Sequence, residues 1–293
     1  MVSTSYNNQV ALLISVIPEV AKENCFALHG GTAINLFYND MPRLSVDIDL
    51  TYVPLEGREI ALTNINLALE RIKQSIEATL KSVKVEHKKE ISKLLVSTNK
   101  AKIKIEVSTT KRGLIEDSES RMLCEKAQDT FDAFCAIEVV DAEQLYGGKI
   151  CAALDRQHLR DLFDMKQLID RCIMKGFIYS LVGSDRPMNE VIRPNLLDQE
   201  HVMKSQFGGM TEIEFTYADF EETRVQLIEE VNSKFLQKDK DFLISIKKGE
   251  PDWDIYDFKD FPSVQWKVMN IQKLKTSKPD KHQYYVDQLK KKL

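Results

Sequence analysis

Strict alternation of polar and apolar residues marks the stretch Ser45-Val46-Asp47-Ile48-Asp49-Leu50-Thr51. Side chains of a strand point alternately to its two faces, so this pattern predicts a half-buried strand with Val46, Ile48 and Leu50 facing the core. Asp47 and Asp49 then project together from the polar face, where two neighbouring carboxylates need a cation or strong hydrogen bonds. Such a pair is a minimal anchor for Mg²⁺ or Mn²⁺, although an isolated pair fits a solvated strand face better.

The segment Gly30-Gly31-Thr32 lies fifteen to seventeen residues before Asp47. It follows a short predicted strand, residues 26–28, and opens a predicted helix, residues 33–38. Glycine lets bare backbone amides approach a phosphate, and a helix N-terminus attracts an anion, but a glycine pair can equally form a tight turn without a ligand. The succession of strand, Gly-Gly, helix and Asp-x-Asp strand is rarer than its parts and favours a phosphate site beside a metal site.

A second alternating stretch covers residues 100–107 and predicts another strand. One face is apolar, and the other carries Lys102, Lys104 and Glu106. A third carboxylate on a neighbouring strand can bridge to a second metal ion, which would lower the pKa of an attacking hydroxyl. Glu106 is therefore the candidate third metal ligand.

Helical patterns dominate the second half of the chain. Helices are predicted over residues 142–156 and 161–171. Lys149 and Arg156 fall at i and i+7 on one face of the first helix, with the small Ala152 between them. A point-charge lysine beside a forked arginine suits a triphosphate.

Arg160 and Asp164 stand four residues apart in the second predicted helix. This spacing can form only a surface ion pair, worth roughly 0.2–0.5 kcal/mol, and that is the favoured interpretation of the residues alone.

The length of 293 residues exceeds that of a usual single domain, and we expect an α+β protein with domains at residues 1–140 and 141–293. A net charge of −4 argues against a uniformly basic nucleic-acid coat and leaves room for a local basic groove. The five cysteines lack C-x-x-C spacing and are expected to be reduced. No signal peptide or membrane span is predicted, which favours a cytoplasmic protein.

The chain ends in a lysine-rich stretch from Lys267 onward. It can be a phosphate-contacting arm, but a solvated tail is the favoured interpretation. Five aromatic residues lie just before it, namely Trp253, Tyr256, Phe258, Phe261 and Trp266. They can stack on bases, yet clustered aromatics more often lock a loop onto a core, which is the role we expect.

The first motif of the AbiEii/AbiGii nucleotidyltransferase toxins resembles Gly30-Gly31-Thr32-Ala33, Arg43, Ser45 and Asp47-Ile48-Asp49. The downstream K-x-x-A and R-D-x-x-D region of that family is similar to Lys149, Ala152, Arg156, Arg160-Asp161 and Asp164. A C-terminal segment of these proteins resembles residues 262–270, so the similarity spans most of the chain. Family members differ at the third acidic site, so Glu106 rests on the strand pattern alone.

The resemblance implies a polymerase-beta-like nucleotidyltransferase, with a mixed-sheet N-terminal lobe and a mainly helical C-terminal lobe. Such an enzyme transfers a nucleoside monophosphate from an NTP to an acceptor and releases pyrophosphate. The expected metal ligands are Asp47, Asp49 and Glu106. The nucleotide is expected to be bound by Gly30, Gly31, Thr32, Ser45, Arg156 and Asp161. Catalysis is expected to depend on Asp47, Asp49, Lys149 and Asp164, and the resemblance makes Asp164 a candidate to position Lys149 or the nucleotide.

Members of this family act as toxins of type IV toxin–antitoxin or abortive-infection systems, beside a separately encoded antitoxin of the AbiEi type. Some relatives modify the acceptor end of tRNA, so RNA is the expected acceptor. Two other functions fit the same residues. One is a catalytically silent NTP-binding protein, against which the intact Asp47 and Asp49 pair argues. The other is small-molecule nucleotidyl transfer, which an acidic acceptor cleft would favour.

Overall fold

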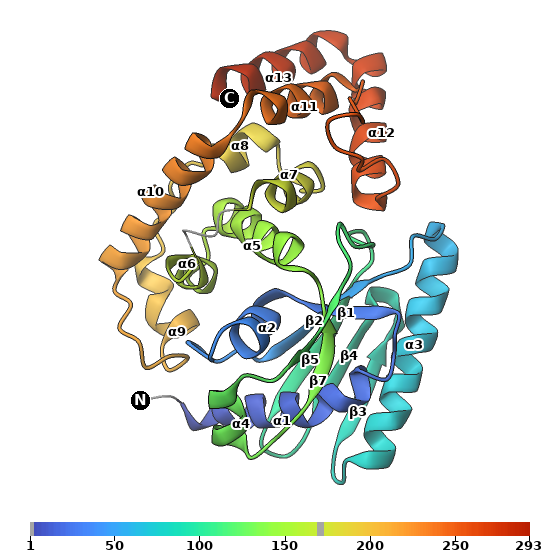
Figure 1. The fold of residues 1–293 in the computed structure, drawn as a ribbon, viewed down its shortest axis with the longest axis vertical. Helices are drawn as coiled ribbons and strands as arrows, with labels where there is room; N and C mark the ends of the chain where they lie inside the picture. The colour runs from blue at the N-terminus through green and yellow to red at the C-terminus, as the bar shows by residue number, and fades with distance from the viewer. Residues whose placement is uncertain (1–2, 169–172) are drawn as a thin grey trace. The chain divides into compact units, whose positions relative to one another are not determined.

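The computed structural model describes residues 3–168 and 173–293, and its fold is α+β, as predicted (Figure 1). Two compact units are present and are described one at a time. Unit 1 comprises residues 1–141 and 207–214, and unit 2 comprises residues 142–206 and 215–293. Residues 207–214, expected in the C-terminal domain, pack with unit 1, where the Met210 carbonyl accepts a hydrogen bond from the Leu44 amide at 2.7 Å.

Unit 1 is built on a seven-stranded mixed sheet in the order β3-β4-β5-β2-β1-β7-β6. Its strands are β1 (Phe26–His29), β2 (Asp47–Tyr52), β3 (Lys84–Lys88), β4 (Lys93–Ser97), β5 (Lys102–Ser108), β6 (Glu119–Met122) and β7 (Ala136–Val139). β2 pairs with β5 in parallel and with β1 antiparallel. The central position of β2 places its polar face between two neighbouring strands.

The helices of unit 1 cover this sheet and connect its strands. They are α1 (Thr4–Val20), α2 (Gly30–Ala33) continued by the π-helix Ile34–Tyr38, α3 (Arg58–Thr79), the short 3-10 helix Lys89–Ile91 and α4 (Glu125–Phe131). α1 packs on β5 and β7, and α3 lies along β3 and β4 (Figure 1). Leu13 and Ile17 of α1 and Ile65 and Leu69 of α3 are completely buried, as an apolar helix stripe against a sheet requires.

β2 begins two residues later than its sequence pattern predicts. Ile48 and Leu50 are buried as expected, but Val46 lies before the strand and is only half-buried. Ser45 is buried instead, because its hydroxyl lies 3.0 Å from the hydroxyl of Thr32. A buried hydrogen-bonded pair has therefore replaced the predicted alternation at the start of the strand.

All regular elements described in unit 2 are helices. They are α5 (Ala142–Arg156), α6 (Leu159–Lys166), α7 (Met174–Val182), α8 (Met188–Ile192), the 3-10 helix Glu200–Val202, α9 (Met203–Phe207), α10 (Tyr217–Lys234), α11 (Gln237–Lys248), α12 (Pro262–Ser277) and α13 (Pro279–Lys292). The helix predicted over residues 161–171 begins earlier and ends at Lys166, and its last three residues lie outside the described part of the chain.

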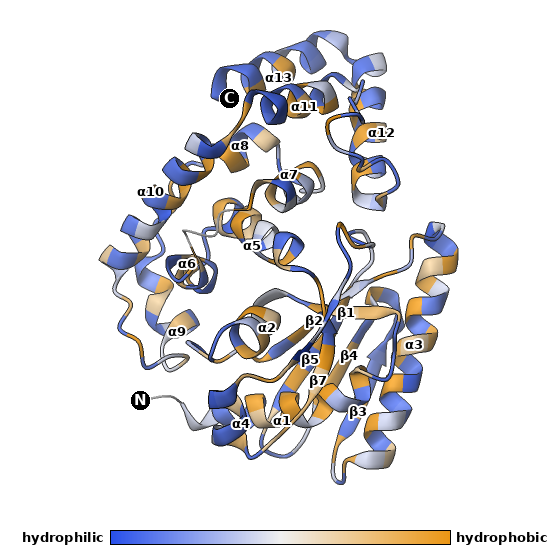
Figure 2. Cartoon of the chain, viewed as in Figure 1, coloured by the Kyte–Doolittle hydropathy of each residue, from blue (hydrophilic) through white to orange (hydrophobic). Residues whose placement is uncertain are grey.

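The lysine-rich end of the chain is helical, so the expectation of a solvated tail is wrong. It forms α12 and α13, which pack on each other and on α11. Ile271, Val286 and Leu289 are buried at these contacts, while most of the lysines are exposed on the hydrophilic side of the helices (Figure 2). Lys267 is an exception, because its Nζ donates to the carbonyls of Ser184 and Arg186. Apolar residues at helical spacing decide the outcome, since a charged segment without them would stay solvated.

The aromatic residues before α12 mostly pack inward, as expected. Tyr256, Phe258 and Phe261 form a cluster of ring contacts with Tyr179 and Phe242, with centroids 4.8–6.1 Å apart. Trp253 joins this cluster through Phe242 at 6.2 Å. Trp266 departs from the expectation, because it stands on the outer face of α12 with 61% of its surface exposed.

The described cysteines and the hydrophobicity of the described helices agree with what the sequence predicts. Among the described residues, Cys25, Cys124, Cys135 and Cys151 form no disulfide bond, while Cys172 lies outside the described residues. Within the described chain, every helix is too short or too polar to cross a bilayer.

Helices α5 and α7 touch through a glycine pair, which predicts a large effect of substitution. A Cβ atom on Gly147 would lie 2.1 Å from the backbone of Gly176, and one on Gly176 would lie 1.8 Å from the Glu143 carbonyl. We expect Gly176→Ala to lower the free energy of unfolding by about 3 kcal/mol, because backbone atoms cannot move aside as a side chain can. Urea denaturation measures this, with Gly57→Ala as control, since a Cβ there meets nothing within 4 Å. Equal stability of the two variants would contradict the prediction.

Candidate active site

Asp47 and Asp49 lie on the face of β2 opposite to Ile48 and Leu50. Both are half-buried, while Ile48 and Leu50 are almost completely buried. The strand therefore separates an apolar face from a carboxylate face, as its alternation predicts.

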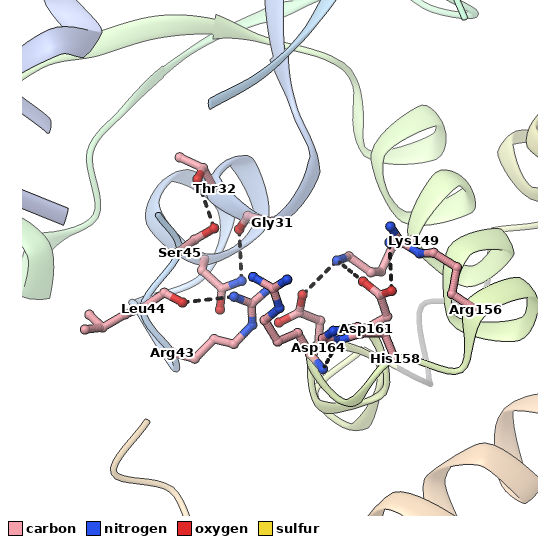
Figure 3. A network of polar contacts seen from close by, with 12 residues as sticks. Gly31, Thr32, Arg43, Leu44, Ser45, Lys149, Arg156, His158, Asp161 and Asp164 are labelled. Carbon is pink, nitrogen blue, oxygen red and sulfur yellow. Dashed lines mark hydrogen bonds and ion pairs between the residues drawn. The ribbon is translucent and has the colours of Figure 1, made fainter. Parts of the chain in front are cut away.

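The glycine pair lies directly against this carboxylate face. Gly30 has a φ of +73°, and a Cβ there would lie 2.6 Å from Oδ2 of Asp49. A Cβ on Gly31 would lie 2.9 Å from Nη2 of Arg43, whose Nη1 donates to the Leu44 carbonyl at 2.9 Å (Figure 3). Only glycine allows this backbone conformation without strain together with such a close approach.

Hydrogen bonds join the start of α2 to the start of β2. The hydroxyl of Thr32 donates to the Asp47 carbonyl. It also lies 3.0 Å from the Ser45 hydroxyl (Figure 3), and Asn35 Nδ2 donates to the Gly31 carbonyl at 2.9 Å. Thr32, Asn35 and Ser45 are all buried. These side chains hold the glycine segment beside Asp47, so Thr32 and Ser45 have a positioning role in this structure.

Two lysines that the sequence interpretation left out of the site lie among the carboxylates. In the register of the sheet, Lys104 stands beside Asp47, and Glu106 stands between Asp49 on one side and Lys93 on the other. Nζ of Lys104 is 3.6 Å from Oδ2 of Asp47 and 3.3 Å from Oε2 of Glu106. Nζ of Lys93 is 3.3 Å from Oε1 of Glu106. The alternation of β5 placed Lys104 on the correct face, but only strand pairing shows which carboxylates it meets.

The pKa values of this group keep it ionised. Partial burial alone would lower the pKa of Lys104, but the carboxylates of Asp47 and Glu106 hold it above its usual value. Partial burial would raise the pKa of Glu106, and the two lysines bring it below its usual value. Lys104 and Glu106 are therefore both charged at neutral pH.

Asp47 and Asp49 fit a two-carboxylate anchor for a divalent ion. Magnesium binds through one or two carboxylates and completes its octahedron with water and phosphate oxygens. Within residues 3–168 and 173–293, no three His, Cys, Asp or Glu side chains gather into a group that could hold a metal ion. The structure brings Glu106 to the same face of the sheet as the two aspartates, where its carboxylate is paired with Lys93 and Lys104.

Unit 2 contains a second polar cluster, at the contact between α5 and α6. Nζ of Lys149 lies 3.0 Å from Oδ1 of Asp161 and 2.9 Å from Oδ2 of Asp164 (Figure 3). Nη2 of Arg156 donates to Oδ2 of Asp161 at 2.8 Å. The side chain of Lys149 is 7% exposed and that of Asp164 is 0% exposed, whereas Arg156 is 63% exposed. Asp164 is therefore a buried partner of Lys149, and the alternative of a surface ion pair with Arg160 is wrong.

Local structure and charge fix this cluster. His158 caps α6, since its Nδ1 accepts a hydrogen bond from the Arg160 amide at 3.2 Å. Burial opposes ionisation of Asp161, but Lys149 and Arg156 outweigh it and lower the pKa of that carboxyl to about 2. Two cations and two carboxylates are thus held together in a mostly buried network.

We expect Gly30→Ala to damage the site more than the fold. The left-handed backbone costs an alanine roughly 1–2 kcal/mol, and the new methyl group must displace the carboxylate of Asp49. A displacement of this kind is expected to lower the rate of nucleotide transfer about 10²-fold. Gly209→Ala is the matched control, because Gly209 has a φ of +78° and faces Ser3 instead of a carboxylate. Equal activity of the two variants, measured as label incorporation, would contradict this role of Gly30.

The sequence profile of the family described as nucleotidyl transferase AbiEii toxin, type IV toxin–antitoxin system, matches residues 11–270. This chain belongs to the AbiEii nucleotidyltransferase toxin family. The match spans both clusters, from the glycine pair of unit 1 to the K-x-x-A and R-D-x-x-D residues of unit 2. The AbiEii-family protein is accordingly a nucleotidyltransferase, and membership implies an NTP substrate and an antitoxin partner.

The fold of this AbiEii-family protein is shared by a solved toxin. The structure of MenT4, a nucleotidyltransferase toxin from Mycobacterium tuberculosis, superimposes with a TM-score of 0.57 at 13% sequence identity. The match covers 89% of this chain and 93% of that chain. At this identity the similarity establishes the fold alone. No curated protein matches the sequence.

Proposed function

We propose that this AbiEii-family protein transfers a nucleoside monophosphate from an NTP to the 3′ end of an RNA, with tRNA as the expected acceptor, and that a divalent ion held by Asp47 and Asp49 is required. The observation that carries the proposal is the position of Asp49, whose carboxylate lies against the bare backbone of Gly30. A phosphate near that backbone would lie beside both aspartates, as metal-assisted phosphoryl transfer requires.

The reaction forms a bond from the acceptor hydroxyl oxygen to the α-phosphorus of the NTP. The bond from that phosphorus to the bridging oxygen breaks, pyrophosphate leaves and the hydroxyl proton passes to water. Bound Mg²⁺ or Mn²⁺ would neutralise phosphate charge and lower the pKa of the hydroxyl. Asp47 and Asp49 orient the reacting groups, while Gly30 and Gly31 leave room for phosphate oxygens beside the backbone.

Lys149 and Arg156 are proposed to serve the same reaction by neutralising the pyrophosphate that leaves. Support comes from the matched K-x-x-A and R-D-x-x-D residues and from the buried network around Lys149. In this proposal Asp161 and Asp164 orient the ammonium group of Lys149. Arg156 is mostly exposed and is the cation of the cluster best able to meet an anion from solution.

An RNA acceptor is supported by the charge of the C-terminal helices. Residues 262–293 contain eight lysines and two acidic residues, although the whole chain has a net charge of −4. Trp266 stands exposed on α12, and an exposed indole can stack on a base. Cationic side chains beside a stacking platform are typical of single-strand binding.

The test is incubation of the purified protein with Mg²⁺, each labelled NTP in turn, and total RNA. Label in RNA of tRNA length, removed by digestion from the 3′ end, is the expected result. Label in protein or in a small molecule would show that the acceptor belongs to that class and is not RNA. Nucleotide binding without transfer to any of these acceptors would contradict the proposed reaction and favour a silent binder.

A further inference from the structure

Glu106 lies between two lysines on one face of the sheet. The pairing of β5 with β4 sets Lys93 directly beside it, and Lys104 lies two residues away on its own strand. The two carboxylate oxygens each have a separate cationic partner, Oε1 with Lys93 and Oε2 with Lys104, both at 3.3 Å. The charge of Glu106 is thus already offset by two ammonium groups.

Lys104 connects Glu106 with the proposed metal anchor. Its Nζ is 3.3 Å from Oε2 of Glu106 and 3.6 Å from Oδ2 of Asp47. The parallel pairing of β2 and β5 places Lys104 beside Asp47 and Glu106 beside Asp49, all on one face of the sheet. An ammonium group therefore stands between two of the three carboxylates that could otherwise share a second metal ion.

A divalent ion bridging Asp47 and Glu106 would have to displace this ammonium group. It would then stand close to a lysine that has lost its partners, and two like charges in a half-buried site repel each other. One divalent ion on Asp47 and Asp49 avoids that repulsion and leaves the ion pairs of Glu106 intact. The ion pairs thus favour one metal ion and one lysine over two metal ions.

We propose that Lys104 supplies the second positive charge of the active site and that Glu106 is a positioning residue for Lys104, so that the protein binds a single divalent ion through Asp47 and Asp49. This inference rests on the proposed function and deepens it. Lys104 then faces the charge that develops on the α-phosphate, in the manner of a fixed cation that needs no reorganisation during the reaction.

The experiment is a titration with Mn²⁺, followed by electron paramagnetic resonance, of the full-length protein carrying a non-hydrolysable NTP analogue. Wild type is expected to bind one Mn²⁺. Glu106→Gln is expected to retain this ion with an affinity within about threefold, whereas Asp47→Asn should weaken it at least about tenfold, as for loss of a group that holds a metal. Lys104→Gln should tighten Mn²⁺ binding or admit a second ion, because it removes a competing cation.

Glu86→Gln is the matched control, because Glu86 is also a strand glutamate paired with a lysine, Lys88 at 2.9 Å, and is exposed. Thermal unfolding of each variant identifies any loss of fold. Two Mn²⁺ ions in wild type, or equal weakening by Glu106→Gln and Asp47→Asn, would overturn the proposal. An unchanged affinity in Asp47→Asn would also overturn it, together with the metal anchor itself.

The transfer assay separates this inference from the proposed function. If the wild type transfers nucleotide to RNA and binds two Mn²⁺ ions, the proposed function is supported and the proposed role of Lys104 is contradicted. If the wild type binds one Mn²⁺ ion and the variants behave as expected but no nucleotide is transferred, the proposed function is contradicted and the single-ion site is supported.

Discussion

Asp47→Asn is expected to lower the rate of nucleotide transfer by about 10²–10³-fold, the effect of losing a charge that stabilises the transition state. Asparagine keeps the shape of the side chain but removes the negative charge that would hold a divalent ion. The hydrogen bond from Thr32 goes to the backbone carbonyl of Asp47, so the contact between α2 and β2 is preserved. The initial rate of label incorporation into RNA, measured over a range of Mn²⁺ concentrations, tests the expectation.

The matched control for this variant is Asp129→Asn, on the exposed side of α4. It makes the same chemical change on a helix surface and is expected to leave the rate within about twofold and stability within about 0.5 kcal/mol. Both proteins should unfold at similar temperatures. A transfer rate in Asp47→Asn close to that of the control would show that the reaction does not depend on this carboxylate.

Lys149→Met is expected to lower the free energy of unfolding by about 3–5 kcal/mol, the usual cost of removing one partner from a buried ion pair. Methionine replaces most of the volume of lysine, so packing is nearly preserved. The buried carboxylate of Asp164 loses a cation at 2.9 Å, and Asp161 loses one of its two ion pairs and keeps the one with Arg156. Denaturation at pH 7 measures the loss, and the transfer rate is expected to fall at the same time.

A surface ion pair provides the control for Lys149. Lys166 pairs with Asp219, and both side chains are substantially exposed. Lys166→Met is therefore expected to cost at most about 1 kcal/mol. If the two lysine variants lost the same free energy of unfolding, the buried network around Lys149 would stabilise the fold no more than a surface ion pair does.

A double variant separates the structural role of Lys149 from its role in the reaction. Lys149→Met combined with Asp164→Asn removes one of the two buried negative charges that faced the lost ammonium group, so it should regain part of the lost stability. Transfer should remain absent, because the cation is still missing. Recovery of transfer in the double variant would show that Lys149 acts only on folding.

The local pattern of the sequence located β2 and β5 and predicted the direction of the side chains within each strand. Alternation at a period of two is a property of the strand itself, and it correctly separated the buried Ile48 and Ile105 from the carboxylates of Asp47 and Glu106. The sequence also singled out the glycine pair, and the structure gives the reason for glycine at position 30, which has a left-handed φ and lies against the carboxylate of Asp49. Family membership also follows from the sequence, through motifs of fixed spacing.

The position of Ser45 and the fate of the lysine-rich end could not be predicted so directly. Whether Ser45 or Val46 is buried depends on the hydroxyl of Thr32, which is thirteen residues away. The charges of the last helices suggested a solvated tail, and a few buried apolar residues such as Val286 and Leu289 overcame them. In both cases partners distant along the chain decided the outcome.

The sequence by itself determined the chemistry of this protein: two aspartates on one strand face, a glycine turn before them, and the motifs of a nucleotidyltransferase toxin. Tertiary structure alone decided which charges meet. The pairing of β2, β5 and β4 surrounds Glu106 with Lys104 and Lys93, and the packing of α5 on α6 buries Lys149 between its carboxylates. The physical reason is that side-chain direction repeats within an element, whereas the neighbour across a sheet or between helices is fixed only when the whole core is packed.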